Sequence, residues 1–393
     1  MPFDFDRVID RRNTHSVKWD GMAARTGCTA PDGIAMWVAD MDFAAPEPVL
    51  ERLRATVDHG VFGYYGADES WRRAICGWMA RRHGWAADPD WITFSPGVGT
   101  ALSVCIAAYS APGEGVVIFA PVYHVFAQLI RVAGRRVIES PLRETQGRYA
   151  MDLEALAASL PPDARMVLLC SPHNPGGTVW TAEELQALAA FCLERDLVLV
   201  SDEVHHDLVY PEARHTVTAV AAPEIGPKLV TLAAPSKTFN LAGLQAAQTI
   251  IAEPGLRAQY RRAAEFAHVL GGNVMGFAAA EAAYDLGEPW LEALIPYLAA
   301  NRDRFAAGLA EAVPGARAMR LEATYLGWAD FAGTGLDDEA VQRRIREGAR
   351  IGVNAGPTFG TGGQARARFN LACPRSTIDT ALGRLAEAFA DLR

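Results

Sequence analysis

Short apolar runs alternate with segments of helical periodicity through the middle of the chain. Five runs that are hydrophobic along most of their length predict buried strands, at residues 115–121, 165–172, 197–204, 228–237 and 246–254. Continuous runs of this kind are typical of a parallel sheet that is covered on both faces. Because helical segments separate the strands, the pattern predicts an α/β fold.

The clearest helical segment lies between the second and third of these strands, over residues 181–196. Thr181 and Glu184 have the spacing of a capping box at its start. One apolar stripe follows along the segment, formed by Leu185, Leu188, Ala189 and Cys192. A strand–helix–strand unit of this kind predicts a helix packed on the sheet through a right-handed crossover.

The pattern changes beyond about residue 288. A long helical segment is followed by a strand-like run at 324–331, a helix near 337–350 and a last helix near 376–392. These elements predict a smaller α+β domain. We therefore expect three parts: an N-terminal segment (1–46) packed with the small domain, a large α/β domain (47–288) and a small C-terminal domain (289–393).

Composition narrows the possible functions. The chain has 393 residues, of which 50% are hydrophobic and 21% charged, and its net charge is −9. An acidic protein lacks the basic face that phosphate backbones require, so neither a nucleic-acid nor a membrane-surface role is expected. No apolar run has the length of a membrane span, and the N-terminus does not resemble a signal peptide. A cytoplasmic location is the expectation.

Lysine and cysteine are sparse. Only three lysines occur, Lys18, Lys228 and Lys237, which limits the candidates for amine chemistry. The six cysteines are scattered without a CxxC pair, and several lie inside apolar runs. They are expected to be buried, reduced thiols.

Unusual polar residues follow three of the predicted strands. One strand ends at Asp202, another is followed by the segment 171–177 (SPHNPGG), and a third by the segment 235–238 (PSKT). Ligands of open α/β sheets collect beyond the carboxyl ends of the strands. The three clusters are therefore expected to converge on one ligand.

Lys237 is the most informative residue, because apolar residues flank it on both sides. Desolvation would lower the pKa of its amine and make it a nucleophile toward an aldehyde. Asp202 could then keep a pyridine nitrogen protonated, as pyridoxal 5′-phosphate (PLP) requires. Together, the two residues predict a Schiff base between Lys237 and PLP.

Two other interpretations of these clusters need weighing. The segment 202–207 contains two histidines among three acids, but no distant motif supplies further metal ligands, so no metal site is expected. Gly97-Val98-Gly99 resembles part of a dinucleotide fingerprint, but the third glycine is missing and the next strand has no terminal acid. A glycine turn before a helix can instead bind the phosphate of PLP.

Two more residue types suit the cofactor ring and an amino-acid substrate. Tyr123, just past a strand, could stack on a pyridine ring. Near the C-terminus, Arg366, Arg368 and Arg375 are candidates for a bidentate grip on an α-carboxylate.

Taken together, the motifs resemble the fold-type I PLP enzymes of the class I/II aminotransferase superfamily, in particular the cystathionine β-lyase-like carbon–sulfur lyases. They occur in the family's order along nearly the whole chain: VIDRRNTHSVKWD, MWVADMDF, FGYYG, FSPGV, PVY, CSPHNPGG, SDEVHHDLVY, APSKTFNLAGLQ, EATYLGWADF and RFNLACPR. The resemblance implies a PLP-dependent transferase fold with a mostly parallel seven-stranded sheet.

The resemblance also implies a role for each matching residue. Lys237 carries the cofactor and transfers protons, and Asp202 pairs with the ring nitrogen. Asn174 and His205 lie near the ring hydroxyl, and Asn174 also contacts substrate. Tyr123 stacks on the ring. Arg368, not Arg366, binds the substrate carboxylate. The phosphate contacts are Val98, Gly99, Ser236 and, from the neighbouring subunit of a homodimer, Tyr64.

Two positions depart from the wider superfamily. Ala234 and Gln245 stand where aminotransferases commonly place a serine and an arginine on the phosphate, and Gln245 is typical of the lyase-like branch. The expected reaction is β-elimination from cystathionine or another cysteine S-conjugate, giving a thiol, pyruvate and ammonia. The segment around Trp37, Val38 and Ala39 is expected to accept the thioether side chain.

Two rival functions stay open at this point. Transamination by the same site would share the first proton transfer and differ in its outcome. A PLP-binding regulatory protein that acts on a transcription factor is the other alternative, which an intact Lys237, Asp202 and Arg368 set disfavours as a sole role.

Overall fold

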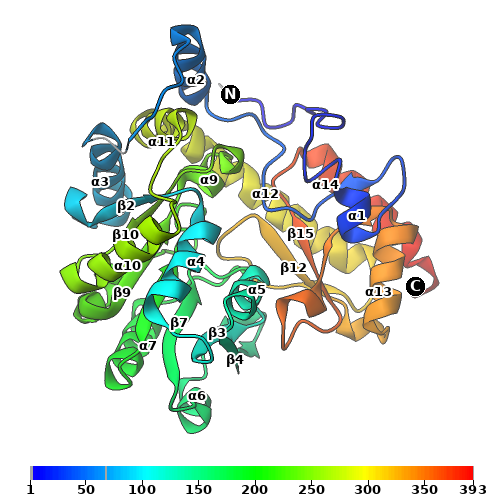
Figure 1. Cartoon of the computed structure of the whole chain (residues 1–393). Helices are drawn as coiled ribbons and strands as arrows, with labels where there is room; N and C mark the ends of the chain where they lie inside the picture. Colours follow the sequence, from blue (N-terminus) through cyan, green and yellow to red (C-terminus); the bar gives the residue numbers. More distant parts are fainter. Residues whose placement is uncertain (1–2, 67–68, 393) are drawn as a thin grey trace.

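The computed structural model describes residues 3–66 and 69–392. A seven-stranded sheet occupies one half of the molecule (Figure 1). Its strands, in spatial order, are β2 (Ile92–Ser95), β10 (Ala247–Ile250), β9 (Leu229–Ala233), β8 (Val198–Asp202), β7 (Ala164–Cys170), β3 (Gly115–Ala120) and β4 (Arg136–Pro141). Only β10 runs antiparallel to its neighbours, so the expected mostly parallel sheet is confirmed.

Helices cover both faces of this sheet. On β3, Val116 and Ile118 face one hydrophobic cluster, whereas Val117 and Phe119 face another. Residues of α4 (Val98–Tyr109), α5 (Val125–Val132) and α10 (Pro254–Phe266) complete the first cluster. Residues of α6 (Leu153–Ser159), α7 (Ala182–Glu194) and α8 (Thr218–Ala221) complete the second. Burial on both faces explains why the strands are continuously apolar.

Helix α7 begins as its sequence predicts. The Thr181 hydroxyl accepts a hydrogen bond from the Glu184 backbone N–H, and the Glu184 carboxylate accepts one from the Thr181 N–H. Its apolar stripe is buried against the sheet.

The predicted strand at 228–237 ends earlier than its apolar run. Strand β9 stops at Ala233, because Pro235 has no N–H to donate to a sheet and instead begins a short helix, α9 (Pro235–Thr238). This helix carries Lys237 and places it just beyond the sheet's edge.

The C-terminal region forms a second unit of helices and strands. It begins with the long helix α12 (Glu288–Ala312) and contains an antiparallel sheet of β11 (Arg317–Ala318), β12 (Leu326–Asp330), β15 (Arg366–Asn370) and β14 (Asn354–Ala355). The predicted helix near 337–350 is α13 (Asp338–Arg343), which continues as a π-helical turn, and the last helix is α14 (Arg375–Ala388).

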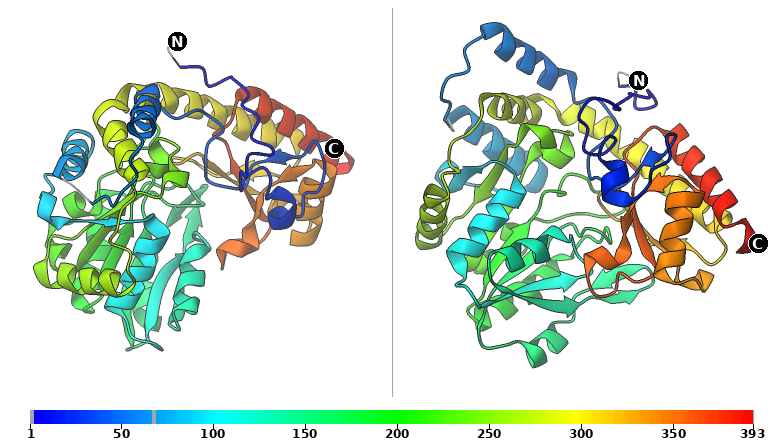
Figure 2. Two further views of the ribbon diagram at one scale, coloured as in Figure 1. Left: turned by 45° about the horizontal axis from the view of Figure 1, so that its top comes forward. Right: turned by 45° about the vertical axis from the view of Figure 1, so that its right-hand side comes forward.

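The N-terminal segment lies against this region (Figure 2). It contains α1 (Met22–Thr26), and its strand β1 (Ile34–Ala35) pairs in parallel with β13 (Ile351–Gly352). A further group of helices, α2 (Glu47–His59), α3 (Glu69–His83) and α11 (Val274–Leu286), shares one hydrophobic cluster with α12 and the small sheet. The large-sheet region and the C-terminal region therefore pack closely against each other. The division of the chain into domains at residues 46 and 288 stays a prediction.

The remaining strands, β5 (Arg143–Thr145) and β6 (Arg148–Ala150), form a short antiparallel hairpin. All six cysteines are free, and all but Cys76 are buried. Among the described residues, no helix combines the length and apolar character needed to cross a membrane.

Candidate active site

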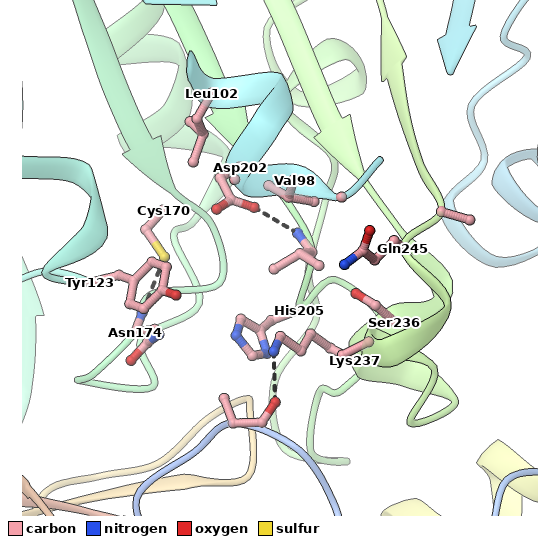
Figure 3. A pocket seen from close by; sticks show the side chains of 16 residues that line it. Val98, Leu102, Tyr123, Cys170, Asn174, Asp202, His205, Ser236, Lys237 and Gln245 are labelled. Carbon is pink, nitrogen blue, oxygen red and sulfur yellow. Dashed lines mark hydrogen bonds between the residues drawn. The ribbon is translucent and has the colours of Figure 1, made fainter. Parts of the chain in front are cut away.

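A cavity of about 200 Å³ lies at the carboxyl ends of β7, β8 and β9 (Figure 3). Parallel neighbouring strands all end at this edge, so the three polar clusters predicted from the sequence meet there. All predicted site residues except Tyr64 and Arg368 line the cavity: Ala39, Val98, Gly99, Tyr123, Asn174, Asp202, His205, Ser236 and Lys237.

Lys237 projects from α9 into the cavity. Its Nζ donates a 2.6 Å hydrogen bond to the carbonyl oxygen of Ala39. Burial lowers the pKa of the Lys237 amine to about 8, with opposing contributions from Asp40 and Asp202, which favour its charged form. A larger fraction of this amine is therefore neutral near physiological pH than for an exposed lysine.

Asp202 ends β8 and is buried. Its carboxylate accepts a 3.2 Å hydrogen bond from the Val204 N–H. Burial raises the pKa of Asp202 to about 7, although the charge of Lys237 favours the ionised form. A cationic ring nitrogen beside this carboxyl would stabilise its ionised form further.

The start of α4 forms the opposite wall. Gly97 precedes the helix with φ of 98°, a conformation that favours glycine, and Val98 and Gly99 occupy its first turn. The first N–H groups of a helix have no intrahelical acceptor and attract anions. A Cβ at Gly97 or Gly99 would meet no protein atom within 4 Å, so the space beside them is free of protein. Ser236 and Gln245 line the same cavity.

Tyr123, Asn174 and His205 form the remaining polar wall. The Tyr123 backbone N–H donates to the Asn174 carbonyl, which ties the two loops together. His205 is buried, and burial together with the charges of Lys237 and Arg368 lowers its pKa well below the usual value, so its imidazole is neutral. Its Nδ1 has no hydrogen-bond partner among the described residues.

Arg368 lies behind Asn174, on β15. It is 2% exposed, and it donates to the side-chain oxygens of Asn174 (2.9 Å) and Asn354 (2.7 Å) and to the carbonyl of Trp37 (2.7 Å). Within residues 3–66 and 69–392 no carboxylate forms an ion pair with it. Arg366, by contrast, pairs with Glu144. Burial without a counter-charge lowers the pKa of Arg368 to about 10.

Sequence reasoning missed the network that holds the segment 37–43 over the cavity. Asn240 accepts from the Met41 N–H and donates to the Met41 and Phe43 carbonyls, while Asn370 donates to the Val38 and Asp40 carbonyls. This network fixes the Ala39 carbonyl, which also accepts a hydrogen bond from the Tyr325 hydroxyl.

A charge cluster anchors the same segment from behind. Lys18, fully buried, pairs with Asp42 at 2.7 Å, and Arg11 pairs with both Asp40 and Asp42. In the sequence, only the scarcity of lysine drew attention to Lys18. Its burial could not be predicted, because its acidic partners lie far along the chain. Most of the segment's side chains face elsewhere: the Trp37 indole donates to the Lys18 carbonyl, and of residues 37–39 only Ala39 lines the cavity.

Tyr64 lies outside this cavity. Its side chain is fully exposed, next to the exposed Val61 and Phe62. The expected contact with a neighbouring subunit stays a prediction.

Residues 33–385 match the model of the family described as aminotransferase class I and II. The chain belongs to this family. It is 41% identical to the cystathionine beta-lyase PatB of Bacillus subtilis over 98% of this chain and 100% of that protein. It is 34% identical to the protein MalY of Escherichia coli, with each chain covered completely. The solved structure of cystalysin from Treponema denticola, which contains a pyridoxal 5′-phosphate cofactor, superposes with a TM-score of 0.96 at 35% identity, again with each chain covered completely.

The lowered pKa of Lys237 predicts how this family member reacts with aldehydes. In protein stripped of any bound aldehyde, reductive methylation of Lys237 should increase with pH with a midpoint near pH 8, because the neutral amine is the reactive form. In urea, where burial is lost, the midpoint should move toward the ordinary value of 10.5. Peptide mass spectrometry measures the labelling, and identical pH profiles in the folded and unfolded protein would show that the fold does not lower the pKa of Lys237.

Proposed function

We propose that this protein is a PLP-dependent carbon–sulfur β-lyase that cleaves cystathionine or related cysteine S-conjugates to a thiol, pyruvate and ammonia. The observation that carries the proposal is that Lys237 and Asp202 line one cavity, while the buried Arg368 lies behind the cavity residue Asn174 without an acidic partner among the described residues. The names of the relatives, cystathionine beta-lyase PatB among them, and the cystalysin structure support the lyase reaction.

The residues around the cavity fit PLP. The N–H groups of Val98 and Gly99 and the hydroxyl of Ser236 would hold the phosphate, Asp202 the ring nitrogen, and Tyr123 one face of the ring. The Asn174 side-chain oxygen accepts from Arg368, which leaves its NH₂ group to donate to the ring hydroxyl, beside His205. Lys237 would carry the cofactor. The neutral Gln245 adds no charge to the phosphate site, which therefore relies on N–H and hydroxyl donors.

Each residue then has a defined task in the reaction. Bound PLP supplies an electron sink for the bond that breaks at the substrate Cα. Arg368 orients the substrate by gripping its α-carboxylate in a bidentate geometry. Lys237 removes the Cα proton and holds it at Nζ, and the thiolate then leaves Cβ. The Ala39 carbonyl, 2.6 Å from Nζ, positions the amine beside the substrate.

Transamination is the alternative outcome of the same proton transfer. It would return a proton to the cofactor instead of releasing the group on Cβ, and it would produce no thiol. The identity of the products therefore separates the two reactions.

We also propose that the protein is a homodimer with a shared active site. Val61 and Phe62 are 66% and 58% exposed and precede the fully exposed Tyr64 in the chain. An apolar surface of this kind is typical of an interface. Tyr64 would reach the phosphate of the partner subunit. The free, mostly buried cysteines suit the reducing cytoplasm, where we propose that the protein acts.

The reaction can be tested with cystathionine. Wild-type protein should release pyruvate and free thiol in equal amounts, and Lys237→Ala should reduce the rate by at least about 10²–10⁴-fold through loss of the proton-transferring base. Lys228→Ala is the matched control, because Lys228 pairs with Asp196 away from the cavity. A keto acid without thiol would contradict the lyase proposal.

Arg368 should govern substrate binding. Arg368→Lys loses the bidentate grip, so the KM for cystathionine should rise by about 10–100-fold, the equivalent of one or two charge-assisted hydrogen bonds. Arg366→Lys, at a residue that pairs with Glu144, should leave KM within about threefold of wild type. Steady-state kinetics measure both values, and equal effects of the two variants would argue against this role.

A further inference from the structure

A second cavity, of about 600 Å³, lies on the other side of the segment that follows β8. His205 lines the first cavity and His206 the second. His83, at the end of α3, and His215 also line the second cavity. Two residues adjacent in sequence thus face two different sites.

Three side chains in this cavity have the spacing of metal ligands. Ligand atoms of His83, His206 and Asp207 all lie within 4.8 Å of one another. The Asp207 carboxylate is 2.8 Å from His83 Nε2 and 3.2 Å from His206 Nε2. Ligand atoms around a tetrahedral zinc ion lie about 3.3 Å apart, given bonds of about 2.0–2.1 Å. Small side-chain movements would bring the three groups to this distance.

His206 has a ring nitrogen available for a ligand. Its side chain is fully buried, and while Nε2 lies 3.2 Å from the Asp207 carboxylate, Nδ1 has no hydrogen-bond partner within the described part of the chain. A buried polar group without a partner is costly, and a metal ion would remove that cost.

Neighbouring groups orient the proposed ligands. The Trp78 indole (3.1 Å) and the Thr238 hydroxyl (2.7 Å) both donate to the Asp207 carboxylate and fix its orientation. Hydrogen bonds to metal ligands from such outer partners are typical of metal sites. His215 lies beside the cluster, held at 3.2 Å by the buried Glu203, and its Nδ1 has no partner among the described residues.

Acidic and basic side chains both surround the proposed ligands. Asp207 and the neighbouring Glu203 are buried. Arg81, Arg82 and Arg214 also line the cavity; Arg81 and Arg82 form ion pairs with Glu288, and Arg82 with Glu292 as well.

We propose that His83, His206 and Asp207 bind a divalent first-row transition metal such as Zn²⁺, with water from the cavity in the fourth position. Two imidazoles and a carboxylate are the donors that such ions accept. A bound metal would also help to fix the position of Lys237, because Asp207 accepts a hydrogen bond from Thr238, the residue after Lys237. The inference stands independently of the proposed lyase reaction.

Calorimetric titration with Zn²⁺ tests the site directly. The holoprotein, treated with EDTA and freed of unbound cofactor, should bind one equivalent. Loss of a group that only hydrogen-bonds to a metal ligand weakens metal binding by about 10–100-fold. His206→Gln and His83→Gln, which remove the ligands themselves, should each weaken Zn²⁺ binding by more than this. His59→Gln is the matched control, since His59 is exposed at the end of α2. Circular dichroism and the yellow absorbance of the cofactor report whether each variant is folded.

X-ray absorption of the zinc-loaded protein separates this site from binding to cysteines. Nitrogen and oxygen ligands with the signature of two imidazoles are expected. Absence of saturable binding, binding that survives both substitutions, or sulfur ligation would overturn the inference. If one variant fails to fold, the other variant and the X-ray absorption spectrum of the zinc-loaded wild type still decide the outcome.

Discussion

Desolvation of charged groups at one edge of the sheet is the constraint on which the site depends. Lys237 and Asp202 line the cavity at the carboxyl ends of the parallel strands, Arg368 lies behind the cavity residue Asn174, and the side chains of Asp202 and Arg368 are buried. Burial moves the pKa of the amine down to about 8 and that of the carboxyl up to about 7. Each of the two groups therefore changes its protonation state near neutral pH, and the buried Arg368 is best stabilised when an anion joins it.

The rest of the fold holds these groups in place. A proline fixes the start of the helix that carries Lys237, and a left-handed glycine lets α4 begin at the cavity wall. Asn240 and Asn370 satisfy the backbone of the segment 37–43, so the Ala39 carbonyl can stay close to the amine. Buried backbone groups need such partners, which explains why the side chains of two asparagines are used here.

The sequence predicted what depends on local pattern. Continuous apolar runs located the strands, the Thr181 capping box located α7, and polar residues after strand ends located most of the cavity wall. Long-range pairings left no such signal. The partners of Lys18 lie more than twenty residues away, and His83 approaches Asp207 only because α3 packs beside that segment. The histidines and acids of segment 202–207 were considered as metal ligands, but no motif pointed to His83 as a distant partner, so the three-residue cluster became visible only in the folded chain.

Borohydride reduction of the holoprotein tests the central claim most directly. Reduction makes an imine between an amine and an aldehyde permanent, and peptide mass spectrometry then locates it. The mass of reduced PLP should be added to the peptide containing Lys237, and to neither Lys18 nor Lys228. Addition at another lysine, or no addition to a yellow protein, would contradict the role of Lys237.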